Sequence, residues 1–145
     1  MTSKDVKDLE RQWVPGGTGG LPPAIAPYSL GTRVGQLVFT AGQAALDESG
    51  KVVGTGDIRA QTMKTLENIG ATLERLGASF KDVVKATIWL KDFRHYAGMN
   101  EVYGSFFPEP APPRACVKAD LVYPDLLVEI EVIAVIGSGT NIGIE

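Results

Sequence analysis

The chain has 145 residues, of which 44% are hydrophobic and 21% charged, an ordinary composition for a soluble globular protein. A chain of this length can bury a sizeable core, so we expect a single main domain. The formal net charge of −3 provides no general attraction for polyanions, which disfavours nucleic acid as a partner.

The sequence lacks the marks of a membrane span or an export signal. No apolar run approaches the roughly 20 residues needed to cross a bilayer. The sequence starts with the polar residues Thr2-Ser3-Lys4-Asp5 and lacks the apolar segment that a secretory signal contains. The single cysteine, Cys116, cannot form a disulfide within the chain. These features predict a cytoplasmic protein that does not associate with membranes.

The first 22 residues differ in character from the rest. Residues 2–13 are charged with few apolar positions, and Pro15-Gly16-Gly17-Thr18-Gly19-Gly20 interrupts any regular structure. We expect residues 1–22 to form an N-terminal arm that is loosely ordered, with docking of Trp13 on a neighbouring subunit as the alternative. The predicted domain spans residues 23–137, and residues 138–145 form a flexible tail.

A hairpin is predicted at the start of this domain. Tyr28 to Val34 and Leu37 to Ala41 have the composition of strands, and Gly35-Gln36 between them is a turn-like pair. Gly42 follows the second strand. A glycine there indicates a close approach by a ligand or another chain, or simply the end of the strand.

Two helices and a third strand follow the hairpin. Apolar residues recur every three or four positions between a predicted cap at Asp57 and a stop at Gly77. The β-branched run from Val83 to Leu90 predicts a strand, and a stripe of aromatic residues predicts a second helix that ends before Pro108. With two further strands near the C-terminus, the order ββαβαββ predicts an α+β fold with two helices on one face of a single-layer mixed sheet.

The last two strands carry the candidate chemistry. Polar residues alternate with apolar ones from Arg114 to Leu121, the period of two expected of a half-buried strand. A second strand is predicted from Leu127 to Val135, and Pro124-Asp125 between them predicts a tight antiparallel turn. Directly opposed residues share a face of the sheet, so the guanidinium of Arg114, the thiol of Cys116 and a carboxylate of the second strand should converge.

Each of these groups has a chemical and a purely structural interpretation. A guanidinium binds a carboxylate through two parallel hydrogen bonds, but Arg114 could equally form a surface salt bridge to Glu129 or Glu131. A carboxylate in a cleft can act as a general acid or base, and periodicity does not rank those two glutamates. Cys116 lacks a visible partner base that would make it a nucleophile. The lone histidine, His95, provides no metal site, so we expect neither metal nor cofactor.

The sequence resembles the Rid (reactive intermediate deaminase, YjgF-like) family of small imine and enamine deaminases. The resemblance is nearly continuous from Pro23 to Val135. It is carried by Pro112-Pro113-Arg114-Ala115-Cys116, Val128-Glu129-Ile130-Glu131-Val132, Ala26-Pro27-Tyr28-Ser29, Phe39-Thr40-Ala41-Gly42-Gln43, Gln61-Thr62 with Leu66-Glu67-Asn68-Ile69, and Met99-Asn100-Glu101-Val102-Tyr103 with Phe106-Phe107.

The resemblance implies a chorismate-mutase-like trimer with a cofactor-independent site in each cleft between subunits. It implies that Arg114 holds the substrate carboxylate, that Glu129 rather than Glu131 positions water, and that Cys116 is a weak donor beside them. Tyr28, Asn100, Ala41 and Ala115 would border the substrate. Ala41 stands where some relatives carry a hydroxyl, so it cannot donate a side-chain hydrogen bond.

The implied activity is hydrolysis of 2-imino or 2-enamino acids to 2-keto acids and ammonia. Two alternatives remain open, a dedicated catabolic deaminase acting on an aminomuconate-like substrate and a binding or chaperone-like trimer without turnover. Ribonuclease activity, attributed to some relatives, is disfavoured because a basic groove and a pair of histidines are both missing.

Overall fold

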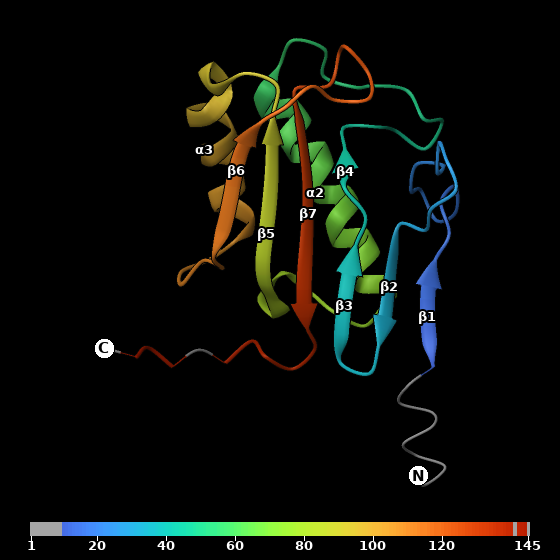
Figure 1. Cartoon of the computed structure of the whole chain (residues 1–145), viewed down its shortest axis with the longest axis vertical. Coiled ribbons are helices and arrows are strands. Elements are labelled where there is room, and N and C mark those ends of the chain that lie inside the picture. Colours follow the sequence, from blue (N-terminus) through green and yellow to red (C-terminus); the bar gives the residue numbers. More distant parts are fainter. Residues whose placement is uncertain (1–9, 141, 145) are drawn as a thin grey trace, which may run out of the picture.

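The chain folds into a mixed β-sheet that carries both α-helices on one face (Figure 1). The structure is a computed structural model that describes residues 10–140 and 142–144. The helices are α2 (Ile58–Arg75) and α3 (Tyr96–Phe106), with short 3-10 helices at Phe80–Asp82 and Phe93–His95. The strands are β1 (Arg11–Val14), β2 (Gly31–Val34), β3 (Leu37–Thr40), β4 (Gln43–Ala44), β5 (Val83–Leu90), β6 (Arg114–Lys118) and β7 (Val128–Val135).

The predicted hairpin and helices form where the local signals place them. β2 and β3 pair antiparallel around Gly35. Helix α2 begins after Asp57, whose side chain accepts a hydrogen bond from the amide of Ala60, and it ends just before Gly77, which has a φ of +82°. Gly77 suits this position because a left-handed residue after a helix is almost always glycine. The predicted α+β fold with two helices on one face of a mixed sheet is confirmed.

The order of the strands corrects one prediction. The sheet runs β1-β2-β3-β7-β5-β6, and the short β4 also pairs with β7. β5 lies between the last two strands, parallel to β6 and antiparallel to β7. The segment after β6 crosses the end of β5 instead of turning back tightly at Pro124-Asp125 (Figure 1). The predicted antiparallel pairing of β6 with β7 is therefore wrong, because β5 takes the central place.

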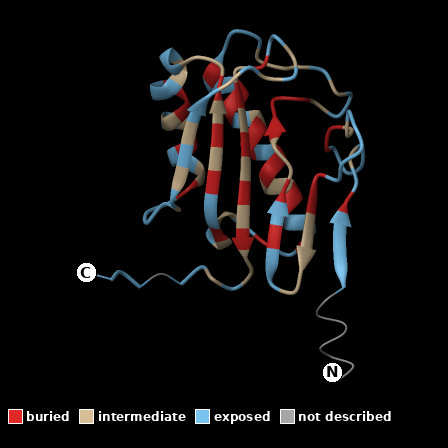
Figure 2. Cartoon of the chain, in the orientation of Figure 1, coloured by how far each residue is buried: buried red, intermediate tan, exposed pale blue. Residues whose placement is uncertain are grey.

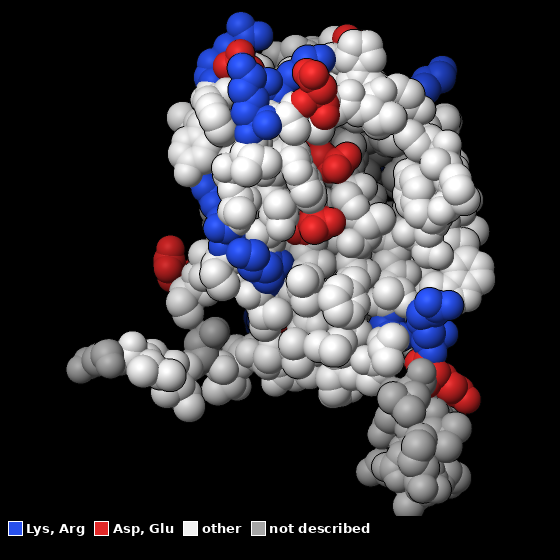
Figure 3. All heavy atoms as spheres, viewed as in Figure 1, with Lys and Arg blue, Asp and Glu red and all other residues white. Residues whose placement is uncertain are grey.

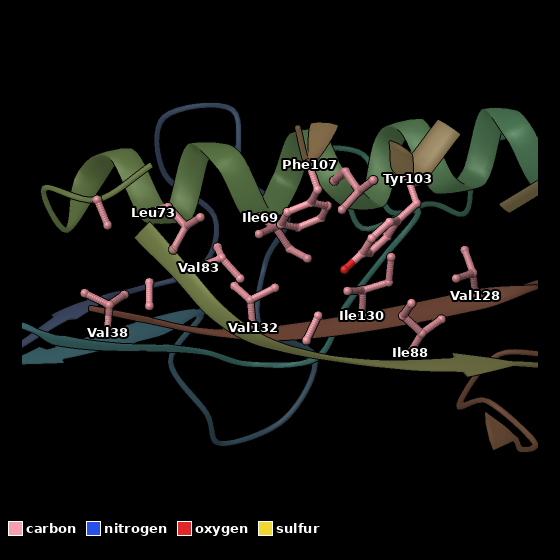
Figure 4. Packing of buried hydrophobic residues seen from close by; sticks show 14 of the residues in the cluster. Val38, Ile69, Leu73, Val83, Ile88, Tyr103, Phe107, Val128, Ile130 and Val132 are labelled. Atoms are coloured by element: carbon pink, nitrogen blue, oxygen red, sulfur yellow. The ribbon is translucent and has the colours of Figure 1, made fainter. Parts of the chain in front are cut away.

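The core lies between the helices and one face of the sheet. Burial alternates along β7 (Figure 2), where Val128, Ile130 and Val132 point toward the helices and are almost completely buried. Figure 4 shows Leu73 of α2 and Tyr103 of α3 over the strands that they cover. One helical layer buries these β7 side chains, so they do not add to the uncovered apolar surface of the sheet.

The second half of the N-terminal arm is ordered, which corrects part of the prediction for residues 1–22. Arg11–Val14 pairs antiparallel with β2 and forms an edge of the sheet. Val14 and Leu21 are buried in the main core. The burial of these two side chains and the strand pairing offset the entropy of ordering the glycine-rich loop between them. The start of the arm, residues 1–9, lies outside the described residues.

The face of the sheet opposite the helices is uncovered and partly apolar. We call it the open face. Trp13, Leu37, Phe39 and Val117 are each at least 40% exposed there. None of the described helices is long and apolar enough to span a membrane, and an apolar sheet face of this kind usually marks a protein contact or a ligand site.

Two buried amides of α2 attach the helix to the segments around β7. Gln61 donates to the carbonyl of Asp125 and accepts from the amide of Leu127, both at 2.8 Å. Asn68 donates to the carbonyls of Ala44 and Leu46, both at 3.1 Å. Buried backbone groups outside regular pairing need such partners. Gln61 therefore fixes the segment that leads into Glu129, since Leu127 precedes Glu129 by two residues. Asn68 fixes Ala44, which pairs with Glu129 from the neighbouring strand.

We predict that Gln61→Met lowers the free energy of unfolding by about 2 kcal/mol, since it keeps the length of the side chain and removes two buried hydrogen bonds. Urea unfolding at a fixed protein concentration, followed by circular dichroism, measures the change. Glu67→Met places the same residue on the exposed side of α2 and should leave the midpoint nearly unchanged. Equal midpoints for the two variants would contradict the anchoring role of Gln61.

Candidate active site

The candidate site residues lie in two groups on opposite faces of the sheet. Arg114 and Cys116 stand opposite Ala86 and Ile88 of β5, which are buried under the helices. Glu129 alternates with the buried Val128 and Ile130, so its side chain points to the open face. The predicted convergence of guanidinium, thiol and carboxylate within one chain is therefore wrong, and each chain carries two half-sites.

The first half-site is centred on Arg114 at the edge strand β6. A shallow hollow of about 440 Å³ is lined by Phe93, Tyr96, Arg114 and Cys116. Asn100 was predicted to border the substrate. It lies on α3 and accepts a hydrogen bond of 2.6 Å from Nη2 of Arg114, so it fixes the guanidinium. We call this group the Arg114 half-site.

Aromatic rings of α3 complete the support of the guanidinium. Nη2 of Arg114 also donates to the hydroxyl of Tyr96 at 3.2 Å. The guanidinium carbon lies 4.8 Å from the ring centre of Tyr103 and 5.7 Å from that of Tyr96, within cation–π range. These contacts hold the planar fork in place, and Nε and Nη1 are not used in the two hydrogen bonds. The fork can therefore donate to a further acceptor such as a carboxylate.

Cys116 is not prepared to act as a nucleophile. Its side chain is half-buried beside Arg114. Burial raises the pKa of the thiol, and the positive charge of Arg114 offsets this only in part. A nucleophilic cysteine needs a lowered pKa, because the thiolate is the reactive form. Cys116 therefore remains a neutral thiol next to the guanidinium.

The second half-site surrounds Glu129 on the open face. A hollow of about 280 Å³ is lined by Ile25, Ala26, Tyr28, Ala41, Gly42, Val122 and Glu129. We call it the Glu129 hollow. Its lining unites Tyr28, Ala41 and Glu129, which the sequence analysis singled out separately. Figure 3 shows this face of the molecule, with acidic side chains near its middle beside a hollowed part of the surface.

Gly42 allows the carboxylate to lie where it does. A Cβ atom on Gly42 would come within 2.7 Å of Oε2 of Glu129 and 2.9 Å of its carboxyl carbon, closer than real contacts allow. A close approach was predicted at Gly42, and within the chain the side chain of Glu129 makes one. Any larger residue at this position would displace the carboxylate from the hollow.

The surroundings of Glu129 favour its protonated form. Burial raises the pKa of Glu129 above its ordinary value, and the nearby charge of Glu131 raises it further. Both effects disfavour a negative charge on the carboxyl group. A carboxyl group with a raised pKa is a better proton acceptor than an ordinary glutamate, which suits a general base. Glu131 also points to the open face, but it does not line the hollow.

The structure adds residues to the site that sequence reasoning assigned elsewhere. The aromatic stripe served only to predict the second helix, yet two of its residues, Tyr96 and Tyr103, contact the guanidinium of Arg114. The sequence analysis did not predict that β5 pairs with β6. Knowledge of that pairing would have placed Arg114 next to α3. Ala115 points to the open face opposite Thr87 and lies in neither hollow. Among the described residues, no group of three or more His, Cys, Asp or Glu side chains could hold a metal ion.

Comparisons with known proteins agree with the fold. The model of the family described as Endoribonuclease L-PSP matches residues 19–136. A RutC family protein of Pyrococcus abyssi is 47% identical over 114 residues, covering 78% of this chain and 89% of the relative. The 3-aminoacrylate deaminase RutC of Acinetobacter baylyi is 44% identical over 115 residues, covering 79% of this chain and 91% of the relative.

Solved structures give the same result. RidA from the Antarctic bacterium Psychrobacter superposes with a TM-score of 0.78 at 33% identity, covering 86% of this chain and 99% of that one. Yeast Mmf1 superposes with a TM-score of 0.78 at 28% identity, covering 87% and 98%. Together the fold and these matches define a small α+β protein of the L-PSP type. The chain belongs to the Rid/YjgF family.

We predict that Glu129 titrates above the ordinary glutamate value of 4.5. Replacing Glu131 with Gln should lower the pKa of Glu129, because it removes the second cause of the shift. Carboxyl-carbon NMR of each variant measures both values. Glu101→Gln on α3, where Glu101 pairs with Arg59, is the control and should leave Glu129 unaffected. A pKa of Glu129 at or below the ordinary value would contradict the half-buried environment.

Proposed function

We propose that the protein is a cofactor-independent deaminase that hydrolyses 2-imino or 2-enamino acids to 2-keto acids and ammonia. The single observation that carries the proposal is the guanidinium of Arg114, held by Asn100 and two tyrosine rings with donors left for a carboxylate. The 44% identity to a protein named 3-aminoacrylate deaminase supports the same class of reaction.

The reaction requires that the substrate be held in a fixed orientation and that one group of the protein carry protons. An enamino acid first takes a proton at its third carbon and loses one from nitrogen, which gives the imine. Water then adds to the electrophilic imine carbon, and its proton passes to the carboxylate of Glu129. Transfer of that proton to nitrogen gives the carbinolamine, in which the former imine carbon carries a hydroxyl and an amino group. The same carboxylate then takes the hydroxyl proton and passes it to nitrogen, so that the C–N bond breaks, ammonia leaves and the carbonyl forms. The raised pKa of Glu129 makes the carboxyl group a better proton acceptor than an ordinary glutamate, and the proton it accepts can be passed on to nitrogen.

Two chains are needed to complete such a site. Arg114 and Glu129 point to opposite faces of one sheet, so one chain alone cannot bring the carboxylate clamp and the proton carrier to one substrate. We propose a homotrimer in which the Arg114 half-site of each subunit meets the Glu129 hollow of the next. Closed cyclic symmetry then completes three equal sites. The apolar residues of the open face, among them Leu37 and Phe39, supply surface for this contact.

This arrangement specifies which residues meet across the interface. The family resemblance implied only that each site lies in a cleft between subunits, and the structure suggests which residues each subunit would contribute. In the proposal, Arg114 joins Asn100 and Cys116 of its own chain, whereas Glu129 joins Tyr28 and Ala41 of the other chain. This arrangement suits a dedicated catabolic deaminase and a general scavenger of imines equally. A binding or chaperone-like trimer without turnover would have the same assembly but no reaction at its sites.

We expect Arg114→Ala to abolish ammonia release from 2-iminopropionate while the fold is retained, because the side chain lies at the surface of an edge strand. Arg114→Lys should recover little activity, since an ammonium lacks the planar fork that binds a carboxylate. Ammonia release from imines generated in situ measures both effects, with circular dichroism as the check on folding. Near-normal turnover by the alanine variant would refute the role of Arg114.

Mixing two inactive variants tests whether each site is built from two chains. Arg114→Ala and Glu129→Gln should each be inactive. In 1:1 mixed trimers, however, about a quarter of the interfaces would join an intact Arg114 half-site to an intact Glu129 hollow. Activity should therefore return to about a quarter of the wild-type level when the two variants are coexpressed with different tags.

In the control, a double variant that carries both Arg114→Ala and Glu129→Gln is used in place of the Glu129→Gln variant. Mixed trimers of the double variant with Arg114→Ala contain no complete site and should remain inactive. Sedimentation should report about three times the chain mass of 15.4 kDa for every sample. Absence of recovery in mixed trimers of that mass would show that the site does not form between chains.

A further inference from the structure

Tyr96 and Asn100 share one nitrogen of the Arg114 guanidinium. Tyr96 is the first residue of α3 and precedes Asn100 by four residues, so both side chains leave the same face of the helix. Nη2 of Arg114 donates to the hydroxyl of Tyr96 at 3.2 Å and to Oδ1 of Asn100 at 2.6 Å. Nη2 carries two hydrogens, so these two bonds leave it no hydrogen for a ligand.

A carboxylate that binds through two parallel hydrogen bonds needs a hydrogen of Nη2. The guanidinium offers two such pairs of donors, Nη1 with Nη2 at its end and Nε with Nη2 along its side, and Nη2 belongs to both. Such a ligand must therefore displace Tyr96 or Asn100 from Nη2. Tyr96 is the partner that gives way, because its hydrogen bond is the longer of the two and its side chain is 43% exposed.

The displaced hydroxyl of Tyr96 stays within reach of the bound carboxylate. The hydroxyl starts 3.2 Å from Nη2, and the carboxylate oxygen that replaces it would lie roughly 2.8 Å from the same nitrogen. Tyr96 lines the open hollow of the Arg114 half-site, so a small rotation of its side chain is enough to make room. A hydroxyl can donate as well as accept. Tyr96 can therefore change from an acceptor of the guanidinium to a donor to the anion.

We propose that Tyr96 is a substrate-binding residue whose hydroxyl holds Nη2 of Arg114 in the free protein, yields it to the substrate carboxylate and then donates its own hydrogen to that carboxylate. The proposal rests on the proposed deaminase function and adds a ligand-binding group to the same site. The carboxylate takes no part in the bond changes at the imine carbon. The hydroxyl therefore contributes to binding of the substrate and not to the chemical step.

Binding of pyruvate, the keto acid formed from 2-iminopropionate, tests the proposal without turnover. Tyr96→Phe keeps the ring beside the guanidinium and removes only the hydroxyl. The variant loses a donor to the anion and also a competitor for Nη2, and the first loss is the larger because hydrogen bonds to charged groups are stronger. Calorimetric titration should therefore show roughly tenfold weaker binding of pyruvate. Equal or tighter binding by Tyr96→Phe would overturn the proposal.

Steady-state kinetics and a matched variant give a second measurement. Tyr96→Phe should raise KM for 2-iminopropionate by about the same factor and leave kcat nearly unchanged, the pattern of an interaction that is equal in the ground state and the transition state. A fall in kcat at unchanged KM would contradict a role in binding. Tyr123→Phe removes a phenolic hydroxyl outside both half-sites, where the ring packs on a separate small cluster, and should change neither constant.

Infrared spectra of bound pyruvate separate a direct contact from an effect that passes through Arg114. The antisymmetric stretch of an isotopically labelled carboxylate responds to the hydrogen bonds that the carboxylate accepts. At saturating pyruvate, this band should differ between wild type and Tyr96→Phe and should be the same in wild type and Tyr123→Phe. Weaker binding by Tyr96→Phe with an unchanged band would show that Tyr96 only positions Arg114, which would overturn the proposal.

The outcomes for this proposal and for the deaminase function can be told apart. Loss of pyruvate binding in Arg114→Ala but not in Tyr96→Phe would refute the role of Tyr96 and leave the carboxylate clamp intact. A wild type that binds pyruvate more tightly than Tyr96→Phe but hydrolyses no imine would support the role of Tyr96 and refute the deaminase function. If Tyr96→Phe reduced the sedimenting mass to that of one chain, the hydroxyl would be a subunit contact and the proposal would be wrong.

Discussion

Strand β5 pairs with β6 on one side and with β7 on the other, and this central position decides where the functional side chains point. Side chains alternate between the faces of a strand, so the registers of β5 send Arg114 toward the helices and Glu129 toward the open face. Neither the aromatic support of the guanidinium nor the hollow around Glu129 would exist if β6 and β7 were neighbours. The division into two half-sites follows from this one topological fact.

The two half-sites have different electrostatic character, which suits a division of labour. The guanidinium of Arg114 is fixed by a short hydrogen bond to Asn100 and by the rings of α3, so little side-chain entropy remains to be lost when a carboxylate binds. Glu129 is half-buried, and its pKa is raised, which suits the transfer of protons. In the proposed reaction, one half-site would orient an anion and the other would exchange protons with the substrate.

The family description names an endoribonuclease, whereas the proposed reaction uses a small anionic substrate. The sequence contains one histidine, and the acidic side chains near the middle of the open face (Figure 3) would repel the phosphates of a nucleic acid. Arg114 instead offers a planar fork within a small hollow. A hollow of this size accommodates a metabolite better than a polymer, and the named deaminase relative is consistent with that choice.

The sequence by itself determined the local elements and the chemical identity of the site. The cap at Asp57, the glycine at 77 and the β-branched run of β5 specify their elements through nearest neighbours in the chain, and the motifs around Arg114 and Glu129 indicate the family. Only the tertiary structure decided that β5 separates β6 from β7, that Tyr103 supports Arg114, and that residues 11–14 add an edge strand. Strand order and cross-layer contacts depend on which distant segments bury each other best, and periodicity along one strand does not contain that information.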